Sequence, residues 1–124
     1  MLFRSCRHRI DAAGYQPVGC GACGCPCAGD RRIAWTVSRA EVGGRTCIVS
    51  HGALEGGGVD LEGLAAGERR AEVREVAGKS YFLFNVGDCR VLATRCRTQI
   101  CVFVVRRNEI DDVWKLAAAI THDR

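Results

Sequence analysis

Apolar and polar positions form their clearest pattern between residues 79 and 107. Residues 79–86, 89–95 and 100–107 are three β-rich runs, separated by Gly87-Asp88 and by a short polar gap. Runs of this kind divided by turn residues predict an antiparallel meander. Because the runs are apolar on both faces, we expect their strands to be central, with helices covering the second face.

A hairpin is predicted upstream of the meander. Residues 33–37 alternate in hydrophobicity, Gly43-Gly44 supplies a turn, and residues 46–51 provide the returning run. Alternation on both sides of a glycine turn is typical of paired strands.

A helix is expected after Gly56-Gly57-Gly58, with Asp60 as its N-cap and Leu61, Leu64 and Ala65 as its apolar positions. Residues 71–76 fit either a continuation of this helix or another strand. The three-residue spacing of Val73 and Val76 slightly favours the helix, and Gly78 ends the segment in either case.

The last segment predicts an amphipathic helix that lies on the sheet. Asn108 is a suitable N-cap, and the acidic residues after it suit the positive end of a helix dipole. The acidic residues are Glu109, Asp111 and Asp112, and the apolar stripe consists of Ile110, Val113, Trp114, Ala117 and Ile120.

Three regions are expected along the chain. Residues 1–13 have apolar positions at helical spacing with arginines between them, which predicts an amphipathic helix or, alternatively, an organelle presequence. Residues 14–30 form a loop rich in cysteine and glycine, and residues 31–124 form a single α/β domain. The predicted fold is an α/β (α+β) domain with a five-stranded antiparallel sheet and packed helices.

The length and net charge of the chain limit the number of domains and the kinds of partner that we expect. The chain has 124 residues and a formal net charge of +4, which suits one domain with a mildly basic surface. Nucleic acid is therefore a possible partner, without being favoured. No apolar run approaches the ~20 residues that span a bilayer. We expect a cytoplasmic protein, or a mitochondrial one if the presequence interpretation holds.

Nine cysteines are many for this length, and an odd number cannot all pair internally. No secretory segment precedes them, so we expect mostly reduced thiols. Cys47, Cys89 and Cys101 fall inside apolar runs and are expected to pack in the core, whereas Cys96 falls in the polar gap.

Four of the cysteines crowd into one short loop and are the candidate metal ligands: Cys20, Cys23, Cys25 and Cys27. Four thiolates suit zinc or an iron–sulfur cluster. Common zinc modules instead separate two C-x-x-C pairs by ~15–20 residues. This spacing favours a flexible cysteine-rich loop, with a metal site and a disulfide or redox role as the alternatives.

Arg95, Arg97, Arg106 and Arg107 are expected to cluster on the second and third meander strands, where they could bind phosphates or a partner. With Trp114 they are the predicted interaction residues. We find no nucleophile elbow, phosphate-binding glycine loop or zinc-protease motif, so the sequence does not predict an enzyme.

Three families share parts of this pattern. The order helix, two strands, helix, three strands, helix resembles the roadblock family of dynein light chains and lysosomal-scaffold adaptors. Residues 33–54 look like that family's opening hairpin and residues 100–107 like its last strand. This resemblance implies a non-catalytic adaptor that forms homo- or heterodimers.

Two further resemblances are local. Residues 78–84 are similar to a central strand of profilin. Residues 85–92 look like the Asn-Val-Gly-Asp-Ser-Arg hairpin of metal-dependent serine/threonine phosphatases, with Cys89 in place of the serine. The metal-binding Asp-Gly-His-Gly segment of those phosphatases is absent, so we interpret this likeness as shared turn chemistry.

Together these observations predict a non-enzymatic protein–protein interaction or adaptor domain that acts in a dimer or larger complex. An open sheet edge and an apolar helix face are the usual means of such assembly. The alternatives are a zinc or iron–sulfur protein that uses the loop at residues 20–27, and a basic subunit associated with RNA or ribonucleoprotein.

Overall fold

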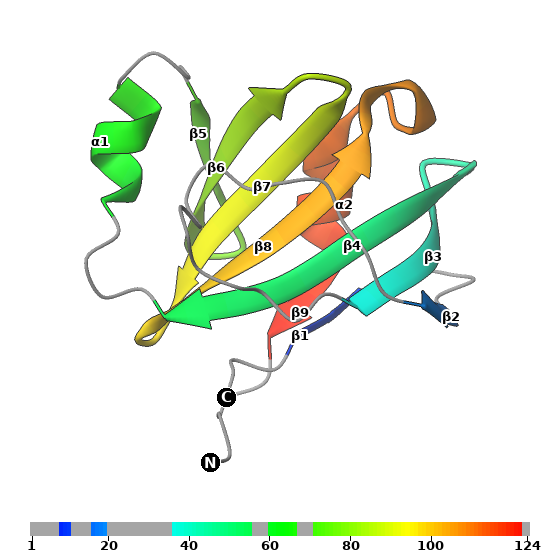
Figure 1. The fold of residues 1–124 in the computed structure, drawn as a ribbon, viewed down its shortest axis with the longest axis horizontal. Helices are drawn as coiled ribbons and strands as arrows, with labels where there is room; N and C mark the ends of the chain where they lie inside the picture. Colours follow the sequence, from blue (N-terminus) through cyan, green and yellow to red (C-terminus); the bar gives the residue numbers. More distant parts are fainter. Residues whose placement is uncertain (1–7, 11–15, 20–35, 56–59, 67–70, 123–124) are drawn as a thin grey trace.

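A computed structural model of the chain describes residues 8–10, 16–19, 36–55, 60–66 and 71–122. Its main feature is a seven-stranded antiparallel sheet in the order β2-β3-β4-β8-β7-β6-β5, beside a two-stranded sheet of β1 and β9 (Figure 1). The strands are β1 (His8–Ile10), β2 (Gln16–Gly19), β3 (Thr36–Val42), β4 (Arg45–Glu55), β5 (Glu72–Val76), β6 (Lys79–Val86), β7 (Cys89–Cys96), β8 (Gln99–Arg106) and β9 (Ile120–His122). The helices are α1 (Leu61–Ala66), the 3-10 helix η1 (Arg107–Glu109) and α2 (Val113–Ala119).

The predicted meander is confirmed. Strands β6, β7 and β8 follow one another as antiparallel neighbours, and Leu92 of β7 lies opposite Leu83 on one side and Phe103 on the other. Figure 1 shows these strands in the middle of the sheet, with α2 behind them. The apolar runs and their two turn segments therefore determine the centre of the fold.

Both faces of the sheet are packed, as the apolar runs predicted. Along β8, Ile100, Val102 and Val104 face one side, and Cys101, Phe103 and Val105 face the other. We call the layer with α2 the α2-side cluster and the layer with α1 the α1-side cluster. The α2-side cluster contains Ala40, Val42, Cys47, Val49, Tyr81, Leu83, Leu92, Cys96, Cys101, Phe103, Val105, Ile110, Val113, Leu116, Ala117 and Ile120. The α1-side cluster contains Leu61, Phe82, Phe84, Cys89, Val91, Ala93, Ile100, Val102 and Val104.

The predicted five-stranded sheet with packed helices is wrong. The main sheet has seven strands, and within the described residues the only α-helices are α1 and α2, of six and seven residues. The main error concerns the segment at residues 71–76, where Glu72–Val76 form strand β5 and the slightly favoured helix does not occur. Val73 and Val76 mimic a helical spacing, but β5 is an edge strand whose side chains are mostly exposed, so burial imposes no alternation on it.

The amino-terminal predictions also need correction where the structure describes them. His8–Ile10 form strand β1 and pair with β9 instead of continuing a helix over residues 1–13. Gln16–Gly19 form strand β2 inside the segment predicted to be loop. The other residues of those two segments lie outside the described ranges, as do residues 33–35 of the predicted first hairpin strand.

The predicted hairpin turn and the helix N-cap at Asp60 are confirmed. Gly43 and Gly44 have φ of 62° and 79°, the left-handed conformation that a two-residue hairpin turn requires. At the start of α1, the Gly63 N–H donates to Asp60 Oδ1 over 3.0 Å. This bond satisfies one of the backbone donors left free at a helix start.

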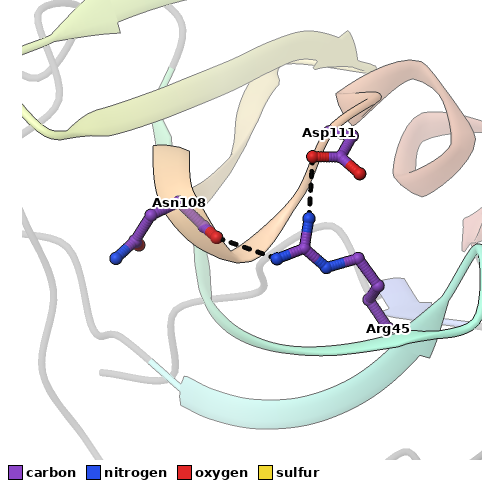
Figure 2. Close-up of polar contacts among 3 residues, drawn as sticks. All are labelled: Arg45, Asn108 and Asp111. Carbon is purple, nitrogen blue, oxygen red and sulfur yellow. Dashed lines mark hydrogen bonds and ion pairs between the residues drawn. The ribbon is translucent and has the colours of Figure 1, made fainter.

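The N-cap of the last helix lies four residues later than predicted. Asp112 is the N-cap, and its Oδ1 accepts from the Trp114 N–H at 3.0 Å, whereas Asn108 lies in η1. Arg45 donates to Asp111 Oδ1 at 2.7 Å and to the Asn108 carbonyl at 3.1 Å (Figure 2). These bonds tie the segment before α2, in which Ile110 is extended, to the β3–β4 hairpin.

The apolar stripe of this segment does lie on the sheet. Ile110, Val113, Ala117 and Ile120 are all buried in the α2-side cluster, and Trp114 packs against it while half-buried. Leu116, which the predicted stripe omitted, is fully buried. Two residues of the predicted stripe are not helical, however: Ile110 is extended and precedes α2, and Ile120 opens β9. The helix itself contributes Val113, Leu116 and Ala117 to the buried face.

Candidate interaction edge

Strand β5 ends the main sheet and presents an exposed edge. Glu72, Val73, Arg74 and Glu75 are all exposed, and β6 is the only strand among the described residues that pairs with β5. Val73 is 51% exposed and is the one exposed large hydrophobic side chain in the described part of the chain. An edge strand with unpaired backbone groups is a template for pairing with another chain.

Hairpin geometry indicates which backbone groups of β5 face outward. Ala77 and Gly78 form a two-residue turn with φ of 52° and 80°, and Val76 lies opposite Lys79. In such hairpins the residues flanking the turn exchange hydrogen bonds, and bonded and non-bonded pairs then alternate. Val76 and Arg74 therefore direct their N–H and C=O groups at β6, whereas Glu75 and Val73 direct theirs away from the sheet.

The opposite edge of the sheet is less suited to pairing. Strand β2 has four residues, one of which is Pro17, and its register with β3 shifts between Pro17 and Gly19. Proline lacks a donor, and a bulge twists an edge away from a flat partner. The two edges are thus chemically different, and β5 is the one with a regular ladder.

Trp114, a predicted interaction residue, lies beside this edge. The Arg74 guanidinium carbon is 4.9 Å from the centroid of the Trp114 ring, which makes a cation–π contact. Arg74 lies opposite Tyr81 of β6, so its side chain is on the α2 side of the sheet. This contact fixes one charged side chain of the edge in position.

The four predicted interaction arginines do not form one cluster. Arg95 and Arg97 lie at one end of the meander, and Arg106 and Arg107 lie at the far end of β8. Arg95 lies opposite Ile100, six positions before Arg106 on β8, so about 20 Å of strand separates the two ends at ~3.3 Å per residue. Successive turns of an antiparallel meander lie at opposite ends of the sheet, so the predicted meander itself separates Arg106 and Arg107 from Arg95 and Arg97. The expected cluster overlooked this consequence.

These arginines have separate local contacts. Arg95 Nη2 donates to Glu62 Oε2 of α1 at 3.2 Å, which links that helix to β7. Arg97 occupies a turn with φ of 58°. The Arg107 N–H donates to the Asp88 carbonyl at 2.8 Å, which closes the end of β8 against the β6–β7 turn.

A buried serine–histidine pair lies on the α2 side of the sheet. Ser38 Oγ is 2.9 Å from His51 Nε2, and the His51 ring stacks on Phe103 with centroids 6.2 Å apart. Burial lowers the pKa of His51 to about 4 from an ordinary 6.5. Ser38 is 0% exposed, so in this conformation its hydroxyl is enclosed and does not present an accessible nucleophile.

Two of the predicted core thiols are confirmed. Cys47 and Cys101 are free and buried. Burial raises the pKa of the Cys101 thiol to about 12, an effect that the nearby Lys79 ammonium partly offsets. Burial, and to a lesser degree the Glu109 carboxylate, also raises the pKa of Cys47. Both thiols therefore stay protonated and act as small apolar side chains.

Cys89 and Cys96 differ from the prediction. Both are buried and disulfide-bonded. The core position predicted for Cys89 is therefore right, but neither residue has the reduced thiol that was expected, and Cys96 is enclosed although it falls in the polar gap. They lie at opposite ends of β7, about 23 Å apart at ~3.3 Å per residue, so each belongs to its own disulfide. The sequence pattern contains no information about which cysteines meet in space.

The metal prediction is not decided by the described residues. Within them no three His, Cys, Asp or Glu side chains gather as metal ligands. The candidate ligands Cys20, Cys23, Cys25 and Cys27 lie outside the described ranges. Among the helices of the described ranges, none has the length and apolar character needed to cross a membrane.

Sequence reasoning missed the β5 edge, although a signal for it was present. Ala77-Gly78 stands between residues 72–76 and the confirmed strand β6, at the spacing of a two-residue hairpin. Comparison of the chain with protein-family models, with curated proteins and with solved structures finds no match. The resemblances to the roadblock, profilin and phosphatase families therefore stay predictions from the sequence.

Proposed function

We propose that this chain is a non-catalytic protein-interaction domain that binds an extended protein segment along strand β5. The single observation that carries this proposal is the exposure of four consecutive β5 residues at a regular sheet edge, including Val73 at 51%. Strand addition obtains affinity from the backbone groups of the edge and selectivity from alternate side chains.

The interior of the domain supports the same proposal. The free thiols of Cys47 and Cys101 and the Ser38–His51 pair are all buried, so the reactive side chains found on the α2 side serve packing. The accessible groups at β5 are the outward backbone N–H and C=O groups and the charged side chains of Glu72, Arg74 and Glu75. These are groups that recognise a strand.

The Val73→Pro variant tests this function directly. Proline removes the outward N–H of Val73, and edge strands tolerate proline where the N–H faces solvent. We expect Val73→Pro to abolish pairing at β5 while leaving the fold intact. Val73→Thr is the matched control, because threonine keeps both the N–H and the β-branched shape.

The measurement is photo-crosslinking in the cells that produce the protein. A photo-reactive amino acid at position 75 should give a protein adduct that Val73→Pro removes and Val73→Thr retains. The same amino acid at position 41, an exposed position on β3, supplies the background. Adducts at position 75 that do not exceed this background, or that Val73→Pro leaves unchanged, would refute the proposed function.

A further inference from the structure

We infer that the partner of the β5 edge is a second copy of this chain, paired antiparallel across a two-fold axis that lies midway between the two copies of Val73. This inference rests on the proposed function and adds the identity of the partner and the register of pairing. It follows from symmetry, the charges of β5 and the faces on which its side chains lie.

Symmetry restricts the possible registers. Two identical antiparallel strands are related by a two-fold axis perpendicular to their sheet, and this axis keeps each side chain on its own face. Residues opposite one another in a ladder must share a face, because side chains alternate with a period of two. One residue of β5 therefore lies opposite its own copy, with the axis midway between the two, and a register in which a residue faces its sequence neighbour is excluded.

Charge and the extent of β5 together select one of its five residues. An axis at Val76 would set Glu75 opposite Ala77 of the turn and leave most of the strand unpaired. An axis at Glu72 or Glu75 places two glutamates directly opposite each other, and an axis at Arg74 does the same with two arginines. Like charges directly opposite destabilise a strand pair. An axis at Val73 instead places valine against valine and sets Glu72 opposite the partner's Arg74 on both sides of the axis.

The faces of the strand agree with this register. Glu72 and Arg74 lie opposite Leu83 and Tyr81, on the α2 side, where the Trp114 ring already holds the Arg74 guanidinium at 4.9 Å. A charged side chain fixed in place loses less conformational entropy when it pairs. Arg74 is therefore positioned to receive the carboxylate of the partner's Glu72.

Val73 lies on the other face of the same strand. It is opposite Phe82 of the α1-side cluster, so pairing at Val73 would cover the exposed valine with its counterpart beside the Phe82 ring. Aliphatic and aromatic side chains that meet across strands stabilise a sheet by ~0.2–1 kcal/mol per pair. The register that satisfies the charges thus also buries the exposed apolar side chain of the edge.

Backbone geometry fits as well. The N–H and C=O groups of Val73 and Glu75 point outward, so in this register Val73 exchanges hydrogen bonds with the partner's Val73, and Glu75 with the partner's Ala71. Two five-residue strands make a small interface. Interfaces below ~1,200 Å² belong to weak or transient complexes, so we expect a concentration-dependent dimer with micromolar or weaker affinity.

Charge exchange between positions 72 and 74 tests the register. Either Glu72→Lys or Arg74→Glu makes both cross-axis pairs repulsive, and each variant alone should dimerise at least about tenfold more weakly than the wild type. An equimolar mixture of the two variants should dimerise again, because every pair across a mixed dimer is then of opposite charge. Sedimentation equilibrium of the purified full chain, monomer mass 13.5 kDa, measures the dissociation constants.

Two controls separate this register from its alternatives. Glu75→Lys has the same charge change on the same strand, but in the proposed register it faces Ala71 and should alter dimerisation little. In a register centred on Arg74, Glu72→Lys would face Val76 and leave the dimer unchanged. Retained dimerisation of both single variants, or no recovery in their mixture, would overturn the proposed register.

Failure of the dimer can be told apart from failure of the proposed function. A wild-type chain that stays monomeric up to ~1 mM would refute self-pairing, since that limit lies beyond weak specific complexes. Photo-crosslinked adducts at position 75 with a different protein, lost in Val73→Pro, would then still support strand addition at β5. Adducts of twice the chain mass together with the charge-exchange result support the two-fold dimer.

Discussion

Replacing Phe103 with alanine is expected to lower the free energy of unfolding by about 4 kcal/mol, because large aromatic residues truncated in a core typically cost ~3–5 kcal/mol. Phe103 is fully buried on β8, the strand packed on both faces, where it lies opposite Leu92 and stacks on His51. Its removal leaves a void between the sheet and α2. Urea unfolding followed by circular dichroism measures the change.

Two variants control this prediction. Phe103→Leu leaves most of the volume in place and should cost clearly less than alanine. Val73→Ala shortens an exposed side chain and should change stability by no more than about 0.5 kcal/mol in a dilute monomeric sample. If Phe103→Ala were as mild as Val73→Ala, then β8 would not be the centre of the core. If the alanine variant fails to fold, the stability loss of Phe103→Leu can still be compared with that of Val73→Ala, and it should be the larger of the two.

Acid is expected to destabilise the domain by about 3 kcal/mol through His51 alone, since each unit of pKa shift corresponds to ~1.4 kcal/mol. Burial lowers the folded-state pKa of His51 to about 4, while the unfolded chain keeps the ordinary value of 6.5. Between these values the unfolded state binds more protons than the folded state. The stability contributed by neutral His51 is therefore fully present above pH 6.5 and is lost as the pH falls toward 4.

The variant His51→Gln isolates this effect. Glutamine keeps a polar group near Ser38 Oγ, which lies 2.9 Å from His51 Nε2, but it does not titrate. The free energy of unfolding, measured in urea from pH 8 down to about 4, should fall steeply for the wild type and much less for His51→Gln. Equal pH profiles for the two proteins would show that His51 is not the group that takes up the proton.

The parts of the fold that the sequence predicted well are those where burial constrains both faces of a strand. In residues 79–107 every second residue must suit one cluster and every intervening residue the other, so apolar side chains fill both sets and the turns stand out. The buried residues of α2 were predictable because a helix that packs by one face repeats its apolar side chains at intervals of three and four. The start of α2 was not, because the segment before it is tied to Arg45, which is distant in sequence and binds Asp111.

The candidate site was not predictable in the same way. Strand β5 is exposed, so its side chains carry no buried alternation, and the spacing of Val73 and Val76 imitated a helix. The pairing of Arg74 with Trp114 joins residues 40 positions apart through the packing of α2 on the sheet. Likewise, the disulfide bonding of Cys89 and Cys96 depends on proximity in space, and neither residue type nor local spacing contains that information.

The central claim is that the β5 edge is open in the single chain and closed by a second copy. Residue-resolved amide hydrogen exchange at low and high protein concentration tests it most directly. We expect the outward amides of Val73 and Glu75 to exchange fast in dilute samples and to become protected as concentration rises, while the β8 amides stay protected throughout. Fast exchange of both β5 amides at every concentration, or full protection even at the lowest, would contradict this account.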